Sequence, residues 1–260
     1  MGMLVGVIHL PALPGSPRSE LGAAECSASA AADARVLAEA GYDAIIVENF
    51  GDTPFFATRV PAITVAAMTA CAVAVRAAAP AVALGINVLR NDAESALAVA
   101  VCTGAAFVRI NVHTGARVTD QGLVQGEAAT TLRLRRALGA ENVAVWADVN
   151  VKHSAPLGGA RPLVQEVEDL TKRGMADVVL VTGEGTGKGV DLEKLAAVKR
   201  ASGKPVLVAS GATLATLGAL AASANGVVVG SALRQGGIPG GAIDARLAKE
   251  FAAAFRAAFA

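Results

Sequence analysis

Short runs of β-branched and aliphatic residues alternate along the chain with longer alanine-rich stretches, in which apolar positions recur at helical spacing. Eight of the short runs have the length and composition of strands. The predicted strands are Leu4–Ile8, Asp43–Val47, Val82–Asn87, Phe107–Ile110, Val143–Asp148, Val178–Val181, Val206–Val208 and Val227–Val229. The predicted helices are Ala28–Ala40, Ala62–Ala78, Ala93–Val101, Glu127–Leu138, Leu163–Arg173, Leu192–Ala201, Thr213–Ala221 and Ala245–Phe259.

Regular alternation of strand and helix is typical of a closed barrel or of an open doubly wound sheet. Eight units favour a single (β/α)8 TIM barrel domain over residues 1–260. Helices run into the next strand through tight glycine-containing junctions, as at Gly41, Gly104 and Gly174, where glycine can end the helix. The loops after the strands are longer and more polar. We therefore expect a functional site at the carboxyl ends of the strands.

Composition excludes several other classes of protein. Lys and Arg total 23 against 22 Asp and Glu, and aromatic residues make up 3%, so no nucleic-acid partner is indicated. The three cysteines lie far apart and lack the spacing of a zinc site, which predicts reduced thiols. The apolar stretch Val60–Leu89 is interrupted by Arg76 and Pro80, which predicts a buried helix and a strand rather than a transmembrane segment. With no signal peptide apparent, we expect a cytoplasmic protein.

Polar side chains gather directly after the predicted strands, and all three histidines, His9, His113 and His153, follow one. The segment Asp148–Ser154 combines acid, amide, amine and imidazole groups, which suits general acid/base chemistry. Strand alternation predicts Asp148, Asn150 and Lys152 on one side if the extended conformation continues. The candidate catalytic residues are Asp148, Lys152, His153 and Glu48. The candidate substrate-binding residues are His9, Asn87, Arg109, Asn111, Asp120 and Thr182, and Arg90 falls at the same rim. A purely structural alternative pairs Arg109 with Asp148 as an ion pair that caps the barrel interior.

Two junctions near the end of the chain indicate phosphate binding. Ser210-Gly211 follows the seventh strand and is predicted to open a helix, and Gly230-Ser231 follows the eighth. Such loops present backbone N–H groups to a phosphoryl group in many barrels; the alternative is a pair of ordinary capped turns. The glycine-rich segment 182–188 is not a nucleotide P-loop, because Gly189 replaces the required hydroxyl residue. It and Gly115–Gly126 are interpreted as loops covering a substrate, or else as plain surface loops.

Six segments resemble the BtpA/SgcQ family. They are Val7–Pro17, Glu48–Phe55, Gly85–Asp92, Val108–Val112, Thr119–Gly122 and Ala147–Ser154. The resemblance covers nearly the whole chain and implies a barrel of the ribulose-phosphate-binding type. It also implies a link to photosystem I biogenesis through an extrinsic, membrane-associated relative. Other members carry a phosphoribosylanthranilate isomerase label, which a cysteine at the end of the first strand would favour; His9 stands there instead.

Three functions follow from these observations. The first is an enzyme that acts on a small phosphorylated metabolite, a sugar phosphate or nucleoside derivative, without a cofactor. The second is a non-catalytic assembly or regulatory factor of the photosystem I biogenesis type, with peripheral membrane association. The third is metal-dependent hydrolysis through Glu48, His9 and Asp148, for which no close-spaced ligand motif exists. The apolar helix Ala62–Val75 could serve a homo-oligomer interface, although burial within one subunit explains it equally well.

Overall fold

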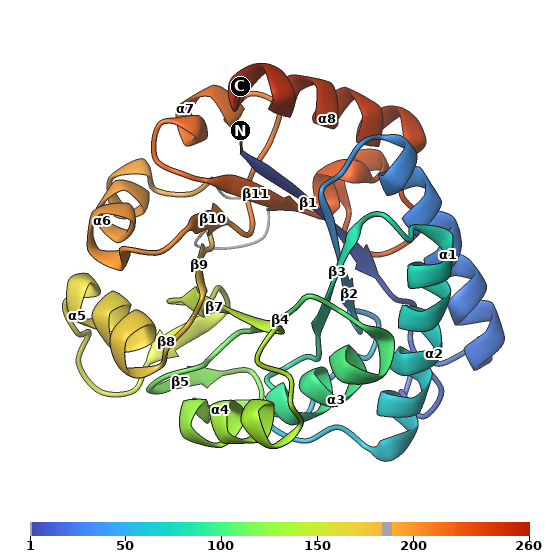
Figure 1. Ribbon diagram of the computed structural model, residues 1–260, viewed down its shortest axis with the longest axis horizontal. Coiled ribbons are helices and arrows are strands. Elements are labelled where there is room, and N and C mark those ends of the chain that lie inside the picture. Colours follow the sequence, from blue (N-terminus) through green and yellow to red (C-terminus); the bar gives the residue numbers. More distant parts are fainter. Residues whose placement is uncertain (1, 184–188) are drawn as a thin grey trace.

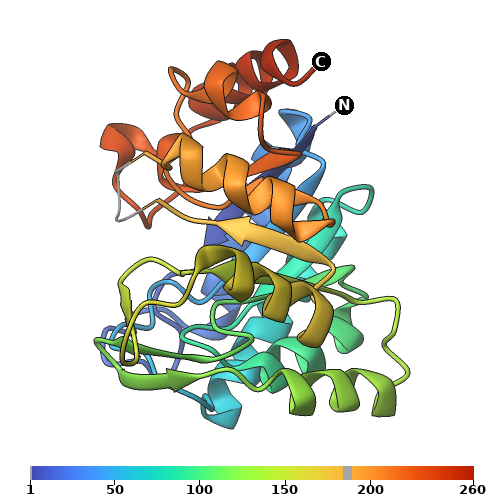
Figure 2. The same cartoon turned by 90° about the vertical axis from the view of Figure 1, so that its left-hand side faces the viewer.

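Residues 2–183 and 189–260 are described by a computed structural model, in which parallel strands close into a barrel ringed by helices (Figure 1). The strands around the barrel are β1 (Met3–His9), β11 (Gly226–Val229), β10 (Val206–Val208), β9 (Val178–Val181), β7 (Ala144–Val149), β4 (Phe107–Ile110), β3 (Ala83–Asn87) and β2 (Ala44–Glu48), which pairs with β1 again. The predicted (β/α)8 TIM barrel is confirmed. In Figure 2 the yellow arrow of β9 points to the left, so the carboxyl ends of the strands form that rim.

The helices cover the outside of the barrel. They are α1 (Ala23–Glu39), α2 (Ala62–Ala78), α3 (Ala93–Thr103), α4 (Ala128–Ala137), α5 (Leu163–Glu168), α6 (Leu192–Ser202), α7 (Leu217–Ala221) and α8 (Ala245–Ala258). Both ends of the chain lie near α8, and Gly2 N donates to Phe259 O at 3.2 Å (Figures 1 and 2). Within the described part of the chain, no helix has both the length and the apolar composition to cross a bilayer.

The seventh helix is shorter than predicted. It begins at Leu217, four residues after the predicted Thr213, because Thr213 N donates to Thr216 Oγ1 at 2.9 Å and closes a turn first. The first helix is longer, since Gly22 N donates to Glu25 Oε2 at 2.8 Å and starts it at Ala23. In both cases a local side-chain hydrogen bond sets the helix end.

Alternation along the strands divides the core into two layers. Val5, Val7 and Ile46 fill the barrel interior, whereas Leu4 and Ile8 pack outward against the helices. The floor of the interior is a stacked pair, Phe107 and Trp146, with ring centroids 3.7 Å apart. A side chain on Gly85 would place its Cβ 2.1 Å from the Phe107 ring, so glycine leaves the space that this ring fills.

A small antiparallel sheet sits beside the barrel rim. It is formed by β6 (Gly122–Gln125), β5 (Ala116–Thr119) and β8 (Ser154–Pro156) in that order. Most of the segment 115–126 is therefore a β-hairpin and not the loop that was predicted, and its role in covering a substrate stays a prediction. Thr119 pairs with Gly122, whose φ of 92° is a left-handed value that glycine adopts readily directly after a hairpin turn, and β8 pairs with β5 from the loop after β7. This second partner is distant in sequence, so alternation within 115–126 could not reveal the sheet.

Candidate functional site

A cavity of about 270 Å³ opens at the carboxyl ends of the barrel strands. Its walls come from β1, β2, β4 and the loops after β7, β10 and β11. The predicted site residues that line it are His9, Glu48, Arg109, Asn111, Lys152, His153, Ser210, Gly211, Gly230 and Ser231. The structure thus brings together most of the polar residues that the sequence placed after separate strands. We call this space the rim cavity.

Strand register explains why polar side chains meet at this rim. His9 lies opposite Glu48 in the β1–β2 pair, and Glu48 lies opposite Asn87 in the β2–β3 pair. Each continues the interior-facing set of its own strand, as Glu48 continues Ala44 and Ile46. The top interior layer is therefore polar, whereas the layers below it are apolar.

A buried ion pair forms one wall of this layer. Arg109 Nε donates to Asp148 Oδ2 at 3.3 Å, and its Nη2 lies 3.2 Å from each carboxylate oxygen. Asn111 Nδ2 also donates to Asp148 Oδ2, at 2.6 Å. Burial opposes the charge of the guanidinium, but the neighbouring Asp148 and Glu48 carboxylates outweigh it and raise the pKa of Arg109. The Asp148 side chain is fully covered, so its link to the rim cavity runs through Arg109 and Asn111, which both line that cavity.

His9 and Glu48 lie next to each other at the ends of the paired strands β1 and β2. Gly240 N donates to His9 Nδ1 at 3.1 Å, which assigns the proton of the neutral ring to Nε2. That Nε2 lies 3.9 Å from Glu48 Oε1, and the ring stacks on Phe50 at 4.3 Å. Burial, followed by the positive charges of Arg234, Lys152 and Arg109, holds the pKa of His9 well below its usual 6.5. His9 is therefore neutral at physiological pH, and its protonated Nε2 lies near Glu48 but beyond hydrogen-bond distance.

Lys152 approaches the cavity from the loop after β7. Its Nζ lies 3.4 Å from Ser210 Oγ, and burial is the main reason that its pKa falls below 10.5, although Glu48 opposes the shift. Thr182 Oγ1 accepts from Lys152 N at 3.1 Å and Arg90 Nη2 donates to Lys152 O at 2.8 Å. Hydrogen bonds on both sides of this peptide thus fix the position of the lysine.

The predicted alternation after Asp148 does not continue. Asn150 has a φ of 52°, so β7 ends at Val149 and the chain turns. Asn150 Oδ1 accepts from Arg117 Nη1 at 2.5 Å, away from the rim cavity, whereas Lys152 returns to it. The expectation that Asp148, Asn150 and Lys152 share one side was therefore wrong. Asparagine tolerates this left-handed conformation better than most residues.

The loops after β10 and β11 lie side by side at the cavity. Among the described residues, the backbone N–H groups of Ser210, Gly211, Ala212 and Ser231 donate to no protein acceptor. Gly211 has a φ of 83°, and a side chain on Gly230 would come 3.0 Å from His9 Nε2. The predicted helix does not open at Ser210-Gly211, because α7 begins later. Loop residues with unbonded backbone N–H groups, rather than a helix end, therefore line the cavity at the first of these loops.

Positive charge dominates the rim cavity. Its described lining contains Arg90, Arg109 and Lys152 against Glu48, with Asp148 in the layer below. Buried Arg90 has no hydrogen-bond partner for Nε among the described residues. Arg234, which the sequence reading missed, is buried and donates to Gly230 O at 2.7 Å and Gly241 O at 3.0 Å. Its only sequence signal is a position shortly after the last strand.

Some predicted site residues lie outside the rim cavity. Asn87 is buried beneath it and donates from Nδ2 to Arg109 O at 3.0 Å. Thr182 supports the backbone of the β7 loop, and Asp120 lines a shallow neighbouring pocket with Arg90 and His153. Of the glycine-rich segment 182–188, residues 184–188 lie outside the described residues, so its interpretation as a covering loop stays a prediction.

The alternative metal site does not form among the described residues, where no group of three or more His, Cys, Asp or Glu side chains is arranged to hold an ion. Asp148 is occupied by Arg109 and Asn111, and His9 Nδ1 by Gly240. His113 is also structural, since its Nε2 lies 2.7 Å from Gly174 O in the protein interior.

The fold and this rim define a (β/α)8 barrel with a polar, cationic cavity at the carboxyl ends of its strands. The model of the BtpA family matches residues 2–257, and the chain belongs to that family. The Photosystem I biogenesis protein BtpA of Synechocystis is 46% identical over 93% of this chain and 83% of its own length. An uncharacterised protein of Pyrococcus furiosus is 41% identical, over 90% of this chain and 87% of that protein.

Solved structures with low sequence identity share the fold. Thiamine phosphate pyrophosphorylase from Pyrococcus furiosus superposes with a TM-score of 0.62 at 13% identity, covering 99% of this chain and 98% of the other. N-(5'-phosphoribosyl)anthranilate isomerase from the same organism gives 0.58 at 17% identity, covering 98% and 99%. At this identity the likeness establishes the barrel architecture alone.

Proposed function

We propose that this protein is an enzyme that acts on a small phosphorylated metabolite by acid/base chemistry in the rim cavity. One observation carries the proposal. Two adjacent loops with unused N–H donors and the Lys152 ammonium beside one of them line the same cavity in which Glu48 lies near His9 and Arg109. Stability alone does not require such a convergence of buried polar groups, which is costly to assemble.

The phosphate would bind to the loops after β10 and β11. Ser210, Gly211, Gly230 and Ser231 surround this end of the cavity, and free N–H groups there can donate to phosphate oxygens. Lys152 adds a charge-assisted hydrogen bond from beside Ser210. The excess of positive over negative lining groups attracts an anion.

Glu48 is the base in this proposal. Its carboxylate lies 3.9 Å from His9 Nε2 and 3.8 Å from Arg109 Nη1, so the positive charge of Arg109 attracts it while both groups remain beyond hydrogen-bond distance. Lys152 is the acid, because its lowered pKa eases proton transfer, and His153 is a second proton carrier at the cavity edge. Arg109 and Asn111 orient the substrate. Asp148, a catalytic candidate from sequence, acts here as a positioning residue, because its covered carboxylate contacts Arg109 and Asn111.

The test combines the purified protein with a mixture of phosphorylated metabolites and follows their consumption by mass spectrometry. Wild type should convert at least one component, and Glu48→Gln should lose about a hundredfold or more of that rate. Glu48→Gln should still bind the compound in a thermal shift assay, since the phosphate loops are unchanged. Absence of both turnover and ligand-induced stabilisation across the mixture would overturn the proposal.

The 46% identity to a Photosystem I biogenesis protein favours a second candidate function, a non-catalytic assembly factor. In that case a partner protein would be captured equally by wild type and by Glu48→Gln, and no metabolite would be consumed. Glu48→Gln therefore separates the two functions, since it changes turnover but leaves the outer surface intact.

A further inference from the structure

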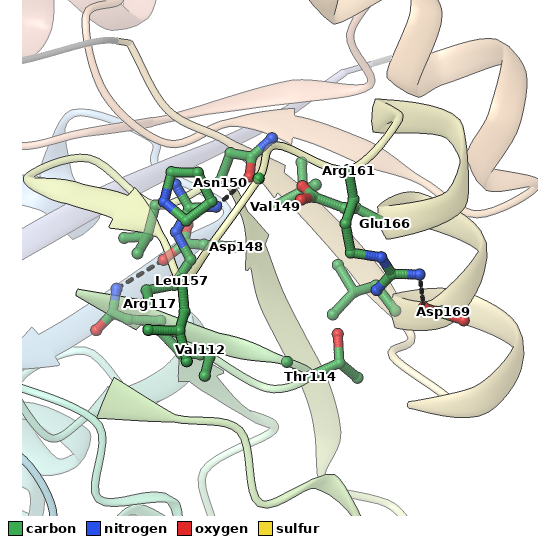
Figure 3. A pocket seen from close by; sticks show the side chains of 17 residues that line it. Val112, Thr114, Arg117, Asp148, Val149, Asn150, Leu157, Arg161, Glu166 and Asp169 are labelled. Atoms are coloured by element: carbon green, nitrogen blue, oxygen red, sulfur yellow. Dashed lines mark hydrogen bonds and ion pairs between the residues drawn. The ribbon is translucent and has the colours of Figure 1, made fainter. Parts of the chain in front are cut away.

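A second cavity, of about 230 Å³, lies beside the rim between the ends of β4 and β7, the β5–β8 sheet and α5 (Figure 3). We call it the side cavity. Its apolar lining includes Val149, Leu157 and Leu170, and its polar lining includes Thr114, Arg117 and Glu166. Figure 3 shows Glu166 and Thr114 on opposite walls. The side cavity thus combines apolar surfaces with a few polar groups, as small-molecule pockets do.

Most of its polar groups are already bonded. Arg117 donates to Ser154 Oγ at 2.9 Å and to Asn150 Oδ1 at 2.5 Å, and Arg161 donates to Asp169 Oδ2 at 2.7 Å. The side chain of Glu166, in contrast, makes no hydrogen bond and no ion pair among the described residues, although its charge interacts with Arg117. Its half-buried carboxylate is therefore the acceptor that a ligand with N–H donors would meet.

The charge of the side cavity differs from that of the rim cavity. Its lining holds Arg117 and Arg161 against Glu166, Asp169 and Asp148, and the charge of Asp148 is compensated by Arg109 from outside the lining, which leaves the rest in balance. A second phosphate would gain nothing from this balance and would face the Glu166 carboxylate. An uncharged ring that donates from nitrogen and packs flat faces against Val149, Leu157 and Leu170 suits it better.

The two cavities lie next to each other along the loop after β7. An intervening cavity of about 300 Å³ shares Lys152 and His153 with the rim cavity, and shares Arg117, Arg161 and Glu166 with the side cavity. Lys152 itself contacts Ser210 of the phosphate loop. This row of adjacent cavities would let a ligand anchored by its phosphate at Ser210 extend past Lys152 toward Glu166.

We propose that the side cavity is the ring-binding subsite of the same site, and that the phosphorylated ligand is a nucleoside 5'-monophosphate. The phosphate would lie on the loops after β10 and β11, the pentose near Glu48 and Lys152, and the nitrogen heterocycle in the side cavity with a donor to Glu166. This inference rests on the proposed function, which supplies the phosphate end.

Calorimetric titration of the full chain with inorganic phosphate, ribose 5-phosphate and the four common nucleoside 5'-monophosphates tests it. At least one nucleotide should bind about tenfold or more tightly than ribose 5-phosphate. Glu166→Ala should remove that advantage, as expected for loss of a hydrogen bond to a charged acceptor, and leave ribose 5-phosphate affinity unchanged. The matched control is Glu168→Ala on the same helix, where the carboxylate pairs with Lys172 on the surface; it should change neither affinity.

A second variant fills the side cavity instead of removing the acceptor. Leu157 is 59% exposed, so Leu157→Trp should fold normally while blocking the ring, and it should also abolish the nucleotide advantage. If ribose 5-phosphate binds but no nucleotide binds more tightly, or if both variants leave the advantage intact, the ring-binding subsite is wrong and the proposed function stands. If no phosphorylated compound binds, both fail.

Discussion

The guanidinium of Arg109 and the carboxylate of Asp148 are joined by contacts of 3.2–3.3 Å while both side chains are buried. Asn87 and Asn111 complete this assembly from β3 and the end of β4. The pair therefore does what the structural alternative predicted, since it closes the barrel interior. The ion pair also holds Arg109 Nη1 3.8 Å from Glu48. The Arg109–Asp148 pair is therefore part of the candidate site as well as of the barrel core.

We expect Asp148→Asn to lower the free energy of unfolding by about 3 kcal/mol or more, because it leaves the buried Arg109 charge uncompensated. Chemical denaturation measures the loss. Glu250→Gln, which breaks an exposed ion pair with Arg246, should cost no more than about 0.5 kcal/mol. Equal losses of unfolding free energy in the two variants would show that the buried ion pair stabilises the fold no more than the exposed one.

The lowered pKa of His9 predicts a pH dependence of stability. Below about pH 6.5 the unfolded chain binds a proton at this residue while the folded protein does not, so the free energy of unfolding falls as the pH decreases. The contribution of one such histidine has a limiting slope of about 1.4 kcal/mol per pH unit. Denaturation of wild type and His9→Gln from pH 7.5 to 5 checks it. His113, whose pKa is also lowered, is present in both proteins and cancels in the difference. Parallel curves would contradict the assignment of a neutral His9.

Much of the fold follows from local pattern. The helix Ala62–Ala78 was predicted with both ends correct, and each predicted barrel strand overlaps an observed one. Both kinds of element are buried along much of their length, so the spacing of their apolar residues reveals them in the sequence. The small sheet escaped prediction for the opposite reason. β8 spans only Ser154–Pro156 and gains its hydrogen bonds from β5, so no periodicity within it marks it as a strand.

The same distinction applies to the site. His9, Glu48 and Arg109 could be placed together because each continues an interior-facing strand register. Arg117 and Glu166 could not be placed together in this way. They line one cavity because the β5 hairpin and α5 pack beside each other, and no local sequence pattern specifies that packing. The turn at Asn150 was equally hidden, since it depends on hydrogen bonds with Arg117 and Thr182.

The lowered pKa of Lys152 predicts how phosphate affinity varies with pH. Only the protonated amine attracts a phosphate dianion, so affinity for ribose 5-phosphate should fall as pH rises through a pKa below 10.5, sooner than for an exposed lysine. Lys152→Met should bind about tenfold more weakly at pH 7 and lack this fall. Lys249→Met, on the exposed side of α8, should keep both the wild-type affinity and its fall with rising pH. An unchanged pH profile in Lys152→Met would exclude Lys152 from the phosphate site. Calorimetry between pH 7 and 10 provides the measurement.

Gly230 links the phosphate loop to His9. Its φ of −128° is not one of the positive values that only glycine adopts readily, so a positive φ does not require glycine here. The space does: an added Cβ would lie 3.0 Å from His9 Nε2 and 3.1 Å from Cε1, and the ring cannot retreat because it stacks on Phe50. We expect Gly230→Ala to cost about 1–3 kcal/mol of unfolding free energy through overpacking, and to weaken ribose 5-phosphate binding by displacing the His9 ring and the loop.

The matched control is Gly218→Ala, which lies in α7 with nothing within 4 Å of an added Cβ. Alanine should be neutral or stabilising by up to about 1 kcal/mol there, because it favours the helix. Thermal unfolding and calorimetry on both variants decide the matter. A Gly230→Ala protein with unchanged stability and affinity would mean that His9 moves freely, and that neither its contact with Glu48 nor its contact with Gly240 holds the site together.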